Sequence, residues 1–187
     1  MKGRASTLTD LGDGRVLRRG GRPAHEAALM ERVRERGFPV PRVYEVRDDA
    51  LVLELVEGPT MAADARRRRW RLPRHMRTLA ELHRRLHELD VVHLDLHPAN
   101  VLLSARGPVV IDWTNAREHG DPAMDDALTW LILRVHAGRL PAWLFARHLD
   151  VRTGLADAGD VRLRDPNVTA EERDRTRSVL ARAGCSL

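Results

Sequence analysis

The sequence has little of several residue types that often carry structure or chemistry. Cys185 is the only cysteine, so no disulfide can form within the chain. Lys2 is the only lysine among 32 lysine and arginine residues, so any cationic site further along the chain must use arginine. Aromatic residues make up 4% of the chain, which predicts a core built mainly from aliphatic side chains.

Long apolar segments are also missing. No apolar run approaches the length of a membrane span, and residues 1–15 lack the charged and then apolar pattern of a secretory leader. We therefore expect a cytoplasmic protein without a membrane partner. With 187 residues, 43% of them hydrophobic, the chain is long enough for one domain or two small lobes that bury a substantial core.

The positive charge comes almost entirely from arginine. The formal net charge is +5 and the isoelectric point is about 10.7. Most arginines are interleaved with aspartate and glutamate, a pattern that favours a solvated surface over a nucleic-acid interface. The four arginines at 66–69, followed by Trp70, form the one run suited to contact nucleic acid or an acidic partner. A solvated helix face is the favoured interpretation of that run.

The most informative stretch is residues 91–113, VVHLDLHPANVLLSARGPVVIDW, a polar loop between apolar runs. It contains His93-x-Asp95, then Asn100 five residues after that aspartate, then Asp112 directly after an apolar triplet. This is the spacing of a phosphoryl-transfer site of the protein-kinase type. Each residue alone is ordinary for a turn or a strand end, but their order between apolar runs favours the functional interpretation.

The chemistry explains why these residue types are needed. In phosphoryl transfer the protein mainly positions groups and neutralises charge. One carboxylate must orient the attacking hydroxyl and accept its proton, and Asp95 is our candidate for this catalytic base. Because Mg²⁺ prefers hard oxygen ligands, the amide oxygen of Asn100 and the carboxylate of Asp112 are our candidate metal ligands.

The loop resembles that of a known family. HLDLHPANVLL is similar to the H-G-D-L-H-x-x-N-V-L loop of the aminoglycoside phosphotransferase and choline kinase family, and VVIDW is similar to its I-D-[FW] motif. The resemblance is specific between Leu82 and Trp130 and implies a short bacterial member with a protein-kinase-like, two-lobe fold of the α+β class. The implied lobes are a reduced, strand-rich nucleotide-binding lobe at 1–56 and a mainly helical catalytic lobe at 57–187.

The resemblance also implies residues that hold the nucleotide phosphates. A loop of small residues covers the phosphates in that family, and residues 3–7, which include Ser6, are its counterpart here. Arg18 stands where the family carries a phosphate-binding lysine, and arginine can bind phosphate through two N–H groups. Glu26 would be the acid that holds Arg18. The alternatives are a surface arginine at a strand end and a glutamate favoured by the helix dipole.

The remaining elements follow from turn residues and apolar spacing. A hairpin is expected at 10–18, and two strands at 42–46 and 50–55 lead into a segment that resembles the hinge between lobes. In such a hinge the adenine bonds to backbone groups, here near Glu54 and Val56. Helical patterns predict helices at 23–36, 72–89, 122–136, 141–149 and 169–183.

Several histidines and one further acid have structural interpretations. His83 and His87 are four residues apart on one expected helix face, but arginines flank them and no cysteine accompanies them, which argues against a zinc site. His93 is expected to pack against the catalytic loop. Asp125 matches the acid that bonds the backbone of this loop in the resembled family, so its expected role is structural.

We therefore expect an ATP-dependent phosphotransferase, with GTP as the alternative nucleotide, Mg²⁺ as cofactor and a small hydroxylated molecule as acceptor. The 75 residues after Asp112 (187 − 112) contain only scattered acids, which does not suit an aminoglycoside. One alternative is a pseudokinase that binds or regulates, which the reduced phosphate loop and the missing lysine favour. Another is a kinase-like protein that acts on a protein or RNA hydroxyl. The oligomeric state stays open.

Overall fold

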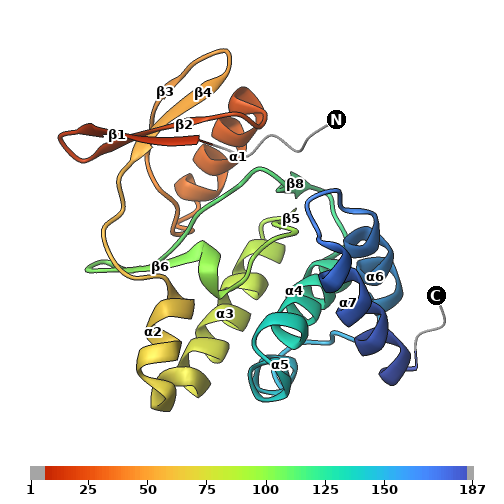
Figure 1. Ribbon diagram of the computed structural model, residues 1–187. Coiled ribbons are helices and arrows are strands. Elements are labelled where there is room, and N and C mark those ends of the chain that lie inside the picture. Colours follow the sequence, from red (N-terminus) through yellow and green to blue (C-terminus); the bar gives the residue numbers. More distant parts are fainter. Residues whose placement is uncertain (1–6, 185–187) are drawn as a thin grey trace.

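The computed structural model describes residues 7–184 and has the expected α+β class, with a small sheet at the N-terminal end and helices beyond it (Figure 1). Ser6, expected in a phosphate loop, lies outside the described residues. The sheet is antiparallel with strand order β1-β2-β4-β3. Its strands are β1 (Thr7–Gly12), β2 (Arg15–Arg19), β3 (Val43–Val46) and β4 (Ala50–Glu54).

The β1–β2 hairpin forms because its turn residues tolerate the required backbone angles. Gly12, Asp13 and Gly14 have φ values of 74°, 49° and 78°, which glycine adopts without strain and aspartate tolerates. Side chains alternate along the strand that follows. Arg18 and Leu17 point to opposite faces and are both buried, each with 6% of its surface exposed, whereas the neighbouring Arg19 is exposed.

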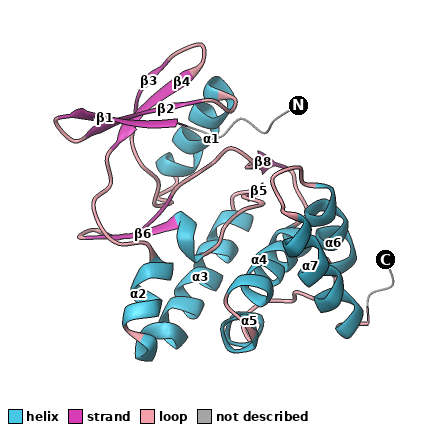
Figure 2. Ribbon diagram, in the orientation of Figure 1, coloured by secondary structure: helices cyan, strands magenta, loops and turns pink. Residues whose placement is uncertain are grey.

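Helix α1 (Pro23–Glu35) lies against this sheet, and two further helices follow the sheet in the chain (Figure 2). Proline suits the first turn of a helix because its missing N–H would have no intrahelical partner there. The chain then forms α2 (Met61–Arg67), the short 3-10 helix η1 (Arg69–Arg71) and α3 (Leu72–His87). Apolar residues recur along α3 at three- and four-residue spacing, and they are buried at Met76, Leu79, Leu82 and Leu86.

Short elements between α3 and the next long helix hold the sequence motif. Strand β5 (Val91–Val92) pairs with β8 (Arg117–Glu118), and β6 (Val101–Ser104) pairs with β7 (Gly107–Val110). The one-turn 3-10 helix η2 (Pro98–Asn100) lies between β5 and β6. The loop with Asp95 therefore runs from β5 to η2, and Asp112 lies two residues after the end of β7.

Four helices complete the described chain: α4 (Pro122–His136), α5 (Arg139–Ala146), α6 (Leu155–Arg164) and α7 (Ala170–Arg182). Asp121 caps α4, and Thr169 with Glu172 forms the capping box of α7. The sequence predicted α4 and α7 closely, began α5 two residues late and missed α6. Within residues 7–184, no helix combines the length and the apolar character that a membrane crossing requires.

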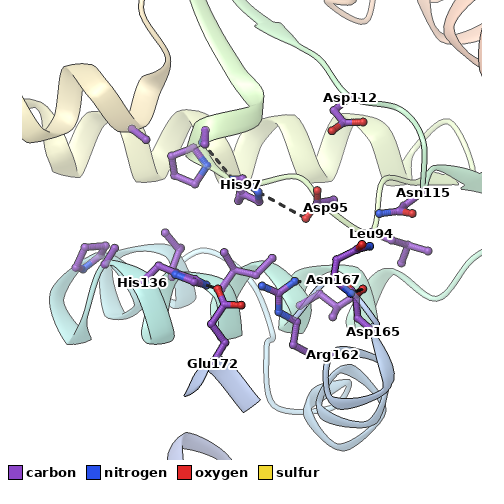
Figure 3. Close-up of a pocket in the computed structure, with 18 of the residues that line it drawn as sticks. Leu94, Asp95, His97, Asp112, Asn115, His136, Arg162, Asp165, Asn167 and Glu172 are labelled. Atoms are coloured by element: carbon purple, nitrogen blue, oxygen red, sulfur yellow. Dashed lines mark hydrogen bonds and ion pairs between the residues drawn. The ribbon is translucent and has the colours of Figure 1, made fainter. Parts of the chain in front are cut away.

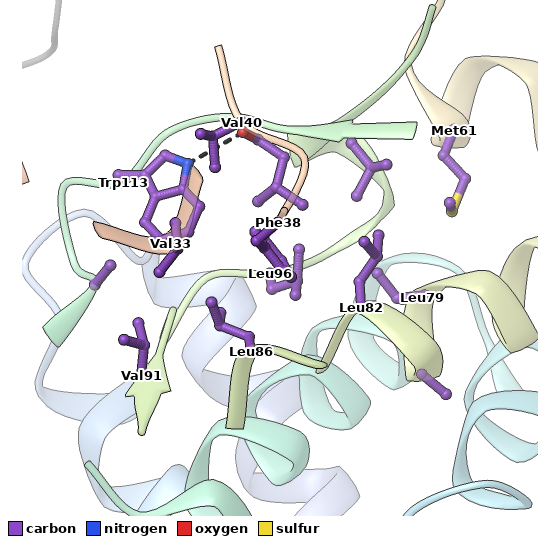
Figure 4. Packing of buried hydrophobic residues seen from close by; sticks show 14 of the residues in the cluster. Val33, Phe38, Val40, Met61, Leu79, Leu82, Leu86, Val91, Leu96 and Trp113 are labelled. Carbon is purple, nitrogen blue, oxygen red and sulfur yellow. Dashed lines mark hydrogen bonds between the residues drawn. The ribbon is translucent and has the colours of Figure 1, made fainter. Parts of the chain in front are cut away.

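One large hydrophobic cluster connects the sheet with the helical part (Figure 4). At its centre, buried Trp113 packs edge-to-face against Phe38, with ring centroids 5.9 Å apart, and its indole N–H donates to the carbonyl oxygen of Val110 at 3.1 Å. Most of the cluster is aliphatic, as the composition predicted. Because the cluster draws residues from both sides of Val56, the division into lobes at 1–56 and 57–187 stays a prediction.

We predict that Gly154→Ala destabilises the fold, because this glycine lets the start of α6 touch the start of α4. A Cβ at Gly154 would meet the carbonyl group of Ala123 and the nitrogen of Met124, backbone atoms that cannot rotate away. The free energy of unfolding should fall by roughly 1–3 kcal/mol in chemical denaturation. The matched variant is Gly159→Ala, whose Cβ would meet only the flexible side chain of Leu180. Equal losses in the two variants would contradict this explanation.

Candidate active site

The loop that carries Asp95 is held in place by Asp125, a fully buried residue near the start of α4. The carboxylate of Asp125 accepts hydrogen bonds from the backbone N–H of His93 at 3.1 Å and of Leu94 at 2.6 Å, and His87 Nε2 lies 3.0 Å from it. Leu94 has a φ of 63°, which is uncommon for leucine. The two backbone bonds therefore fix a loop conformation that the leucine itself would not favour.

The charge of Asp125 is maintained by its neighbours. Burial alone would raise the pKa of Asp125, but the hydrogen bond from His87 and the nearby imidazoles of His83 and His93 lower it to about 2. The carboxylate is consequently ionised and can accept several hydrogen bonds at once. The structure thus gives Asp125 the position next to the loop backbone that the resemblance implied.

His83 extends the same buried network from α3. Its Nδ1 lies 2.9 Å from Asp126 Oδ1, and although burial lowers the pKa of His83, the carboxylates of Asp126 and Asp125 raise it overall. His83, His87 and Asp126 are close enough to hold a metal ion. Both imidazoles already pair with carboxylates, so we interpret this cluster as a brace between α3 and α4.

Asp95 and Asn100 face each other within the loop. Asn100 Nδ2 donates to the backbone oxygen of Asp95 at 2.9 Å and to its Oδ2 at 3.1 Å, so the amide oxygen of Asn100 is not used in these bonds. Burial and the carboxylate of Asp112 raise the pKa of Asp95 to about 6, with Arg162 and the Asn100 hydrogen bond acting in the opposite direction. Such a carboxylate accepts protons better than an ordinary aspartate and is still mostly ionised at neutral pH.

Asp112 lies on the segment after β7, at the same end of the cleft as Asp95 (Figure 3). Its φ of 61° is left-handed, a conformation that clusters at functional sites when it occurs outside glycine. Ile111 N donates to the carbonyl oxygen of Asn100 at 3.0 Å, which holds this segment against the loop. Thr114 donates to Asp112 Oδ1 at 2.9 Å. The amide oxygen of Asn100 and the second carboxylate oxygen of Asp112 are hard donors that fit Mg²⁺.

Arg18 and Glu26 form a buried ion pair between β2 and α1, in which Arg18 Nη2 donates to Glu26 Oε2. Glu26 is completely buried, and its second oxygen accepts a hydrogen bond from Arg22 N at 2.8 Å. The other nitrogen of the guanidinium, Nη1, donates to Thr114 Oγ1 at 3.3 Å. A chain of contacts therefore runs from Glu26 through Arg18 and Thr114 to Asp112.

Gly21 places this ion pair at the wall of the cleft. Gly21 lines the cleft and has a φ of 73°. A Cβ at this position would meet Glu26 Oε1 and would lie 3.3 Å from Arg18 Nη1. The guanidinium therefore lies directly behind a residue without a side chain, where the phosphates of a nucleotide could approach it.

The expected adenine segment shows which backbone donors are in use. Glu54 N donates to the carbonyl oxygen of Arg42 at 2.9 Å, and Leu55 N donates to that of Gly14 at 2.8 Å. The amide of Val56 has no hydrogen-bond partner in residues 7–184. Of the two hinge residues named from the sequence, Val56 is therefore the one with a backbone donor available for a base.

A cleft of about 1630 Å³ opens beside Asp95 and Asp112. The other described candidates do not line this cleft: Asn100, Arg18, Glu26, Glu54 and Val56. Three residues of the site were missed by the sequence analysis, namely Gly21, Thr114 and Arg162. Gly21 sits in a recognisable Gly-Gly turn, but Thr114 and Arg162 reach the site through the fold and have no local signal.

The model of the family described as RIO domain matches residues 22–135, which is more than half of the chain. No curated protein matches the chain. The match supports the kinase-like fold predicted from the loop motif. It does not support the more specific resemblance to the aminoglycoside phosphotransferase and choline kinase family. The matched segment contains Asp95, Asn100, Asp112 and Asp125 and begins four residues after Arg18.

We predict that Asp125→Ala strongly destabilises the protein. The substitution leaves two backbone N–H groups and the imidazole of His87 without their buried partner. The free energy of unfolding should fall by about 3–5 kcal/mol, measured by chemical denaturation. As a control, Asp174→Ala removes an exposed carboxylate that pairs with Arg177 on α7, and it should change stability by less than about 1 kcal/mol. Similar effects of the two variants would refute the anchoring role.

Proposed function

Because the chain belongs to the RIO-domain family, we propose that it is a phosphotransferase that moves the γ-phosphate of ATP to a hydroxyl group. RIO domains are atypical, kinase-like, ATP-binding phosphotransferase domains. The observation that supports the proposal most is that Asp95 and Asp112 lie at one end of the cleft, with Asn100 hydrogen-bonded to Asp95. GTP is the alternative nucleotide.

In the proposed mechanism Asp95 orients the acceptor hydroxyl and takes its proton, a role that suits a carboxylate with a raised pKa. Asn100 and Asp112 would hold Mg²⁺, which supplies positive charge to the phosphates when it is bound. Arg18 would bind phosphate oxygens through the wall at Gly21, and Glu26 would keep the guanidinium in place. The backbone groups of Glu54 and Val56 would flank the adenine of the nucleotide.

The acceptor in this proposal is a small hydroxylated molecule. The cleft exceeds the roughly 300–1,000 Å³ of most small-molecule sites, so it has room for an acceptor beside the nucleotide phosphates. A protein hydroxyl is the second candidate, because RIO domains are typically protein kinases, including those of ribosome biogenesis. A pseudokinase remains the alternative without catalysis, and it is separated from the others by nucleotide binding and turnover.

We predict that Asp112→Asn weakens Mg²⁺-dependent ATP binding by about tenfold or more, because an amide is a poorer ligand for Mg²⁺ than a carboxylate. Titration calorimetry with and without Mg²⁺ measures this directly. Asp157→Asn, on the exposed side of α6, serves as the control and should bind as the wild type does. Unchanged binding and turnover in Asp112→Asn would remove this residue from the proposed site, and a wild type without nucleotide binding would favour the pseudokinase.

We also predict that Arg18 contributes to nucleotide affinity. The double variant Arg18→Gln/Glu26→Gln removes both charges, so neither is left buried without its partner. ATP affinity should fall by about tenfold or more, because a phosphate contact of an arginine is lost. The matched control is Arg19→Gln, which changes the neighbouring residue on the exposed face of β2. Equal ATP affinities in the double variant and the control would show that the ion pair is only structural.

A further inference from the structure

The large cleft lies mainly on the acceptor side of the candidate base. Neither the hinge residues Glu54 and Val56 nor the buried Arg18 line it. Its walls come from α2, η1 and the start of α3 on one side, and from α4–α7 on the other. Most of the lining therefore comes from the helical part beside Asp95, and none comes from the expected adenine segment at Glu54 and Val56.

Arginine is the main charged residue of these walls. Five arginines contribute to the lining: Arg66, Arg69, Arg139, Arg162 and Arg164. Within residues 7–184, no ion-pair or hydrogen-bond partner is found for the side chains of the first three. They are exposed at the mouth of the cleft, Arg66 and Arg69 on one wall and Arg139 on the other.

The carboxylates of the acceptor side are already paired. Asp160 forms an ion pair with Arg164 at 3.0 Å, and Glu172 lies 3.2 Å from His136. Asp165 lies 3.8 Å from Arg162. Away from Asp95 and Asp112, five arginines and three carboxylates line the cleft, so the formal charge left over on these walls is positive. An anion on these walls would meet the guanidinium groups of Arg66, Arg69 and Arg139, which have no partner within residues 7–184.

Arg162 brings this positive charge to the base itself. Figure 3 shows its side chain extending from α6 toward the loop with Asp95. The side chain is mostly buried, with 19% of its surface exposed. Its ion-pair partner is the carboxylate of Asp165, at a distance of 3.8 Å. Burial is the main cause that lowers the pKa of His97 to about 4, and Arg162 acts in the same direction.

Apolar side chains line the cleft between the arginines. They come from both walls: Leu72, Met76, Leu128, Ile132, Leu133 and Leu140. An occupant that suits these walls combines an uncharged body with an anionic group and presents a hydroxyl to Asp95. Arginine binds phosphate and carboxylate groups alike through paired N–H donors, so the geometry suits either anion.

We propose that the phosphoryl acceptor is a small hydroxylated anion, whose phosphate or carboxylate group is bound by the cleft arginines while its hydroxyl faces Asp95. This assignment rests on the proposed phosphotransferase function and adds the charge class of its substrate. Arg162 is the inner anion-binding residue, close to Asp95. The outer anion-binding residues are Arg66, Arg69 and Arg139. The hydroxyl oxygen forms a bond to the γ-phosphorus, ADP leaves, and Asp95 receives the hydroxyl proton.

Three related compounds test the charge preference: uncharged glucose, the carboxylate gluconate and the phosphate ester glucose 6-phosphate. Their binding is measured by calorimetry with Mg²⁺ and a saturating non-hydrolysable ATP analogue, so that the nucleotide phosphate site is filled. We expect at least one anion to bind about tenfold tighter than glucose, because charge-assisted hydrogen bonds to arginine are strong. The carboxylate and phosphate arms show which anion is preferred.

Arginine variants locate the binding. The exposed double variant Arg66→Gln/Arg69→Gln and the inner variant Arg162→Gln should each reduce the preference for the anion by about tenfold. Arg177→Gln removes an exposed arginine that pairs with Asp174 on α7 outside the cleft, and it should leave the preference unchanged. The double variant affects only exposed side chains, so the test stands even if Arg162→Gln is destabilised.

Two binding results would overturn the proposal: equal binding of glucose and both anions, or no binding of either anion at millimolar concentration. An anion preference that survives the arginine variants would also overturn it. So would RNA binding with a steep salt dependence that the same variants abolish. Repeating the anion titrations without nucleotide separates a failure of the phosphotransferase function from a failure of the anionic acceptor. Anion binding without nucleotide binding would refute the phosphotransferase alone. Nucleotide binding without a charge preference would refute only the anionic acceptor.

Discussion

The candidate active site depends on one buried carboxylate, that of Asp125. An isolated buried charge would be very costly, and this one is stabilised by two backbone N–H groups and by imidazoles from α3. The same contacts hold Leu94 in a left-handed conformation and thereby fix the direction of the following Asp95. The position of Asp95 is therefore determined by buried polar contacts among α3, the loop and α4, and the loop alone would not maintain it.

A second constraint couples the sheet to the proposed metal ligands. Because the guanidinium of Arg18 is planar and carries several N–H groups, it can bond Glu26 with one nitrogen and Thr114 with another. Thr114 in turn bonds Asp112. An ammonium group at this position would be a single point of charge with less directional contacts. In a chain with one lysine, arginine thus links β2, α1 and the segment after β7.

Local patterns predicted the parts of the site that depend on spacing along the chain. Asp95, Asn100 and Asp112 were found because their order and apolar flanks are typical of one kind of chemistry, and their metal and catalytic roles stay predictions. Helix α6 was missed because only Leu155 and Ala158 are buried apolar residues in it, alongside glycine and several charged residues. Its position follows from the close approach of Gly154 to α4, a long-range contact that no local pattern reveals.

The segment that matches the family contains only part of the residues that line the cleft, and this bears on the substrate. Residues 22–135 contain the proposed base and metal ligands, whereas Arg139, Arg162 and Arg164 belong to α5 and α6, beyond the matched segment. The matched segment therefore holds the residues proposed for phosphoryl transfer, and the helices after it form one wall of the cleft. Under the proposed assignment, positive charge on that wall would repel polycations and favour anions as acceptors. In the proposed reaction, the candidate base and metal ligands lie inside the matched segment, whereas the proposed acceptor arginines lie partly inside it, at Arg66 and Arg69, and partly on α5 and α6.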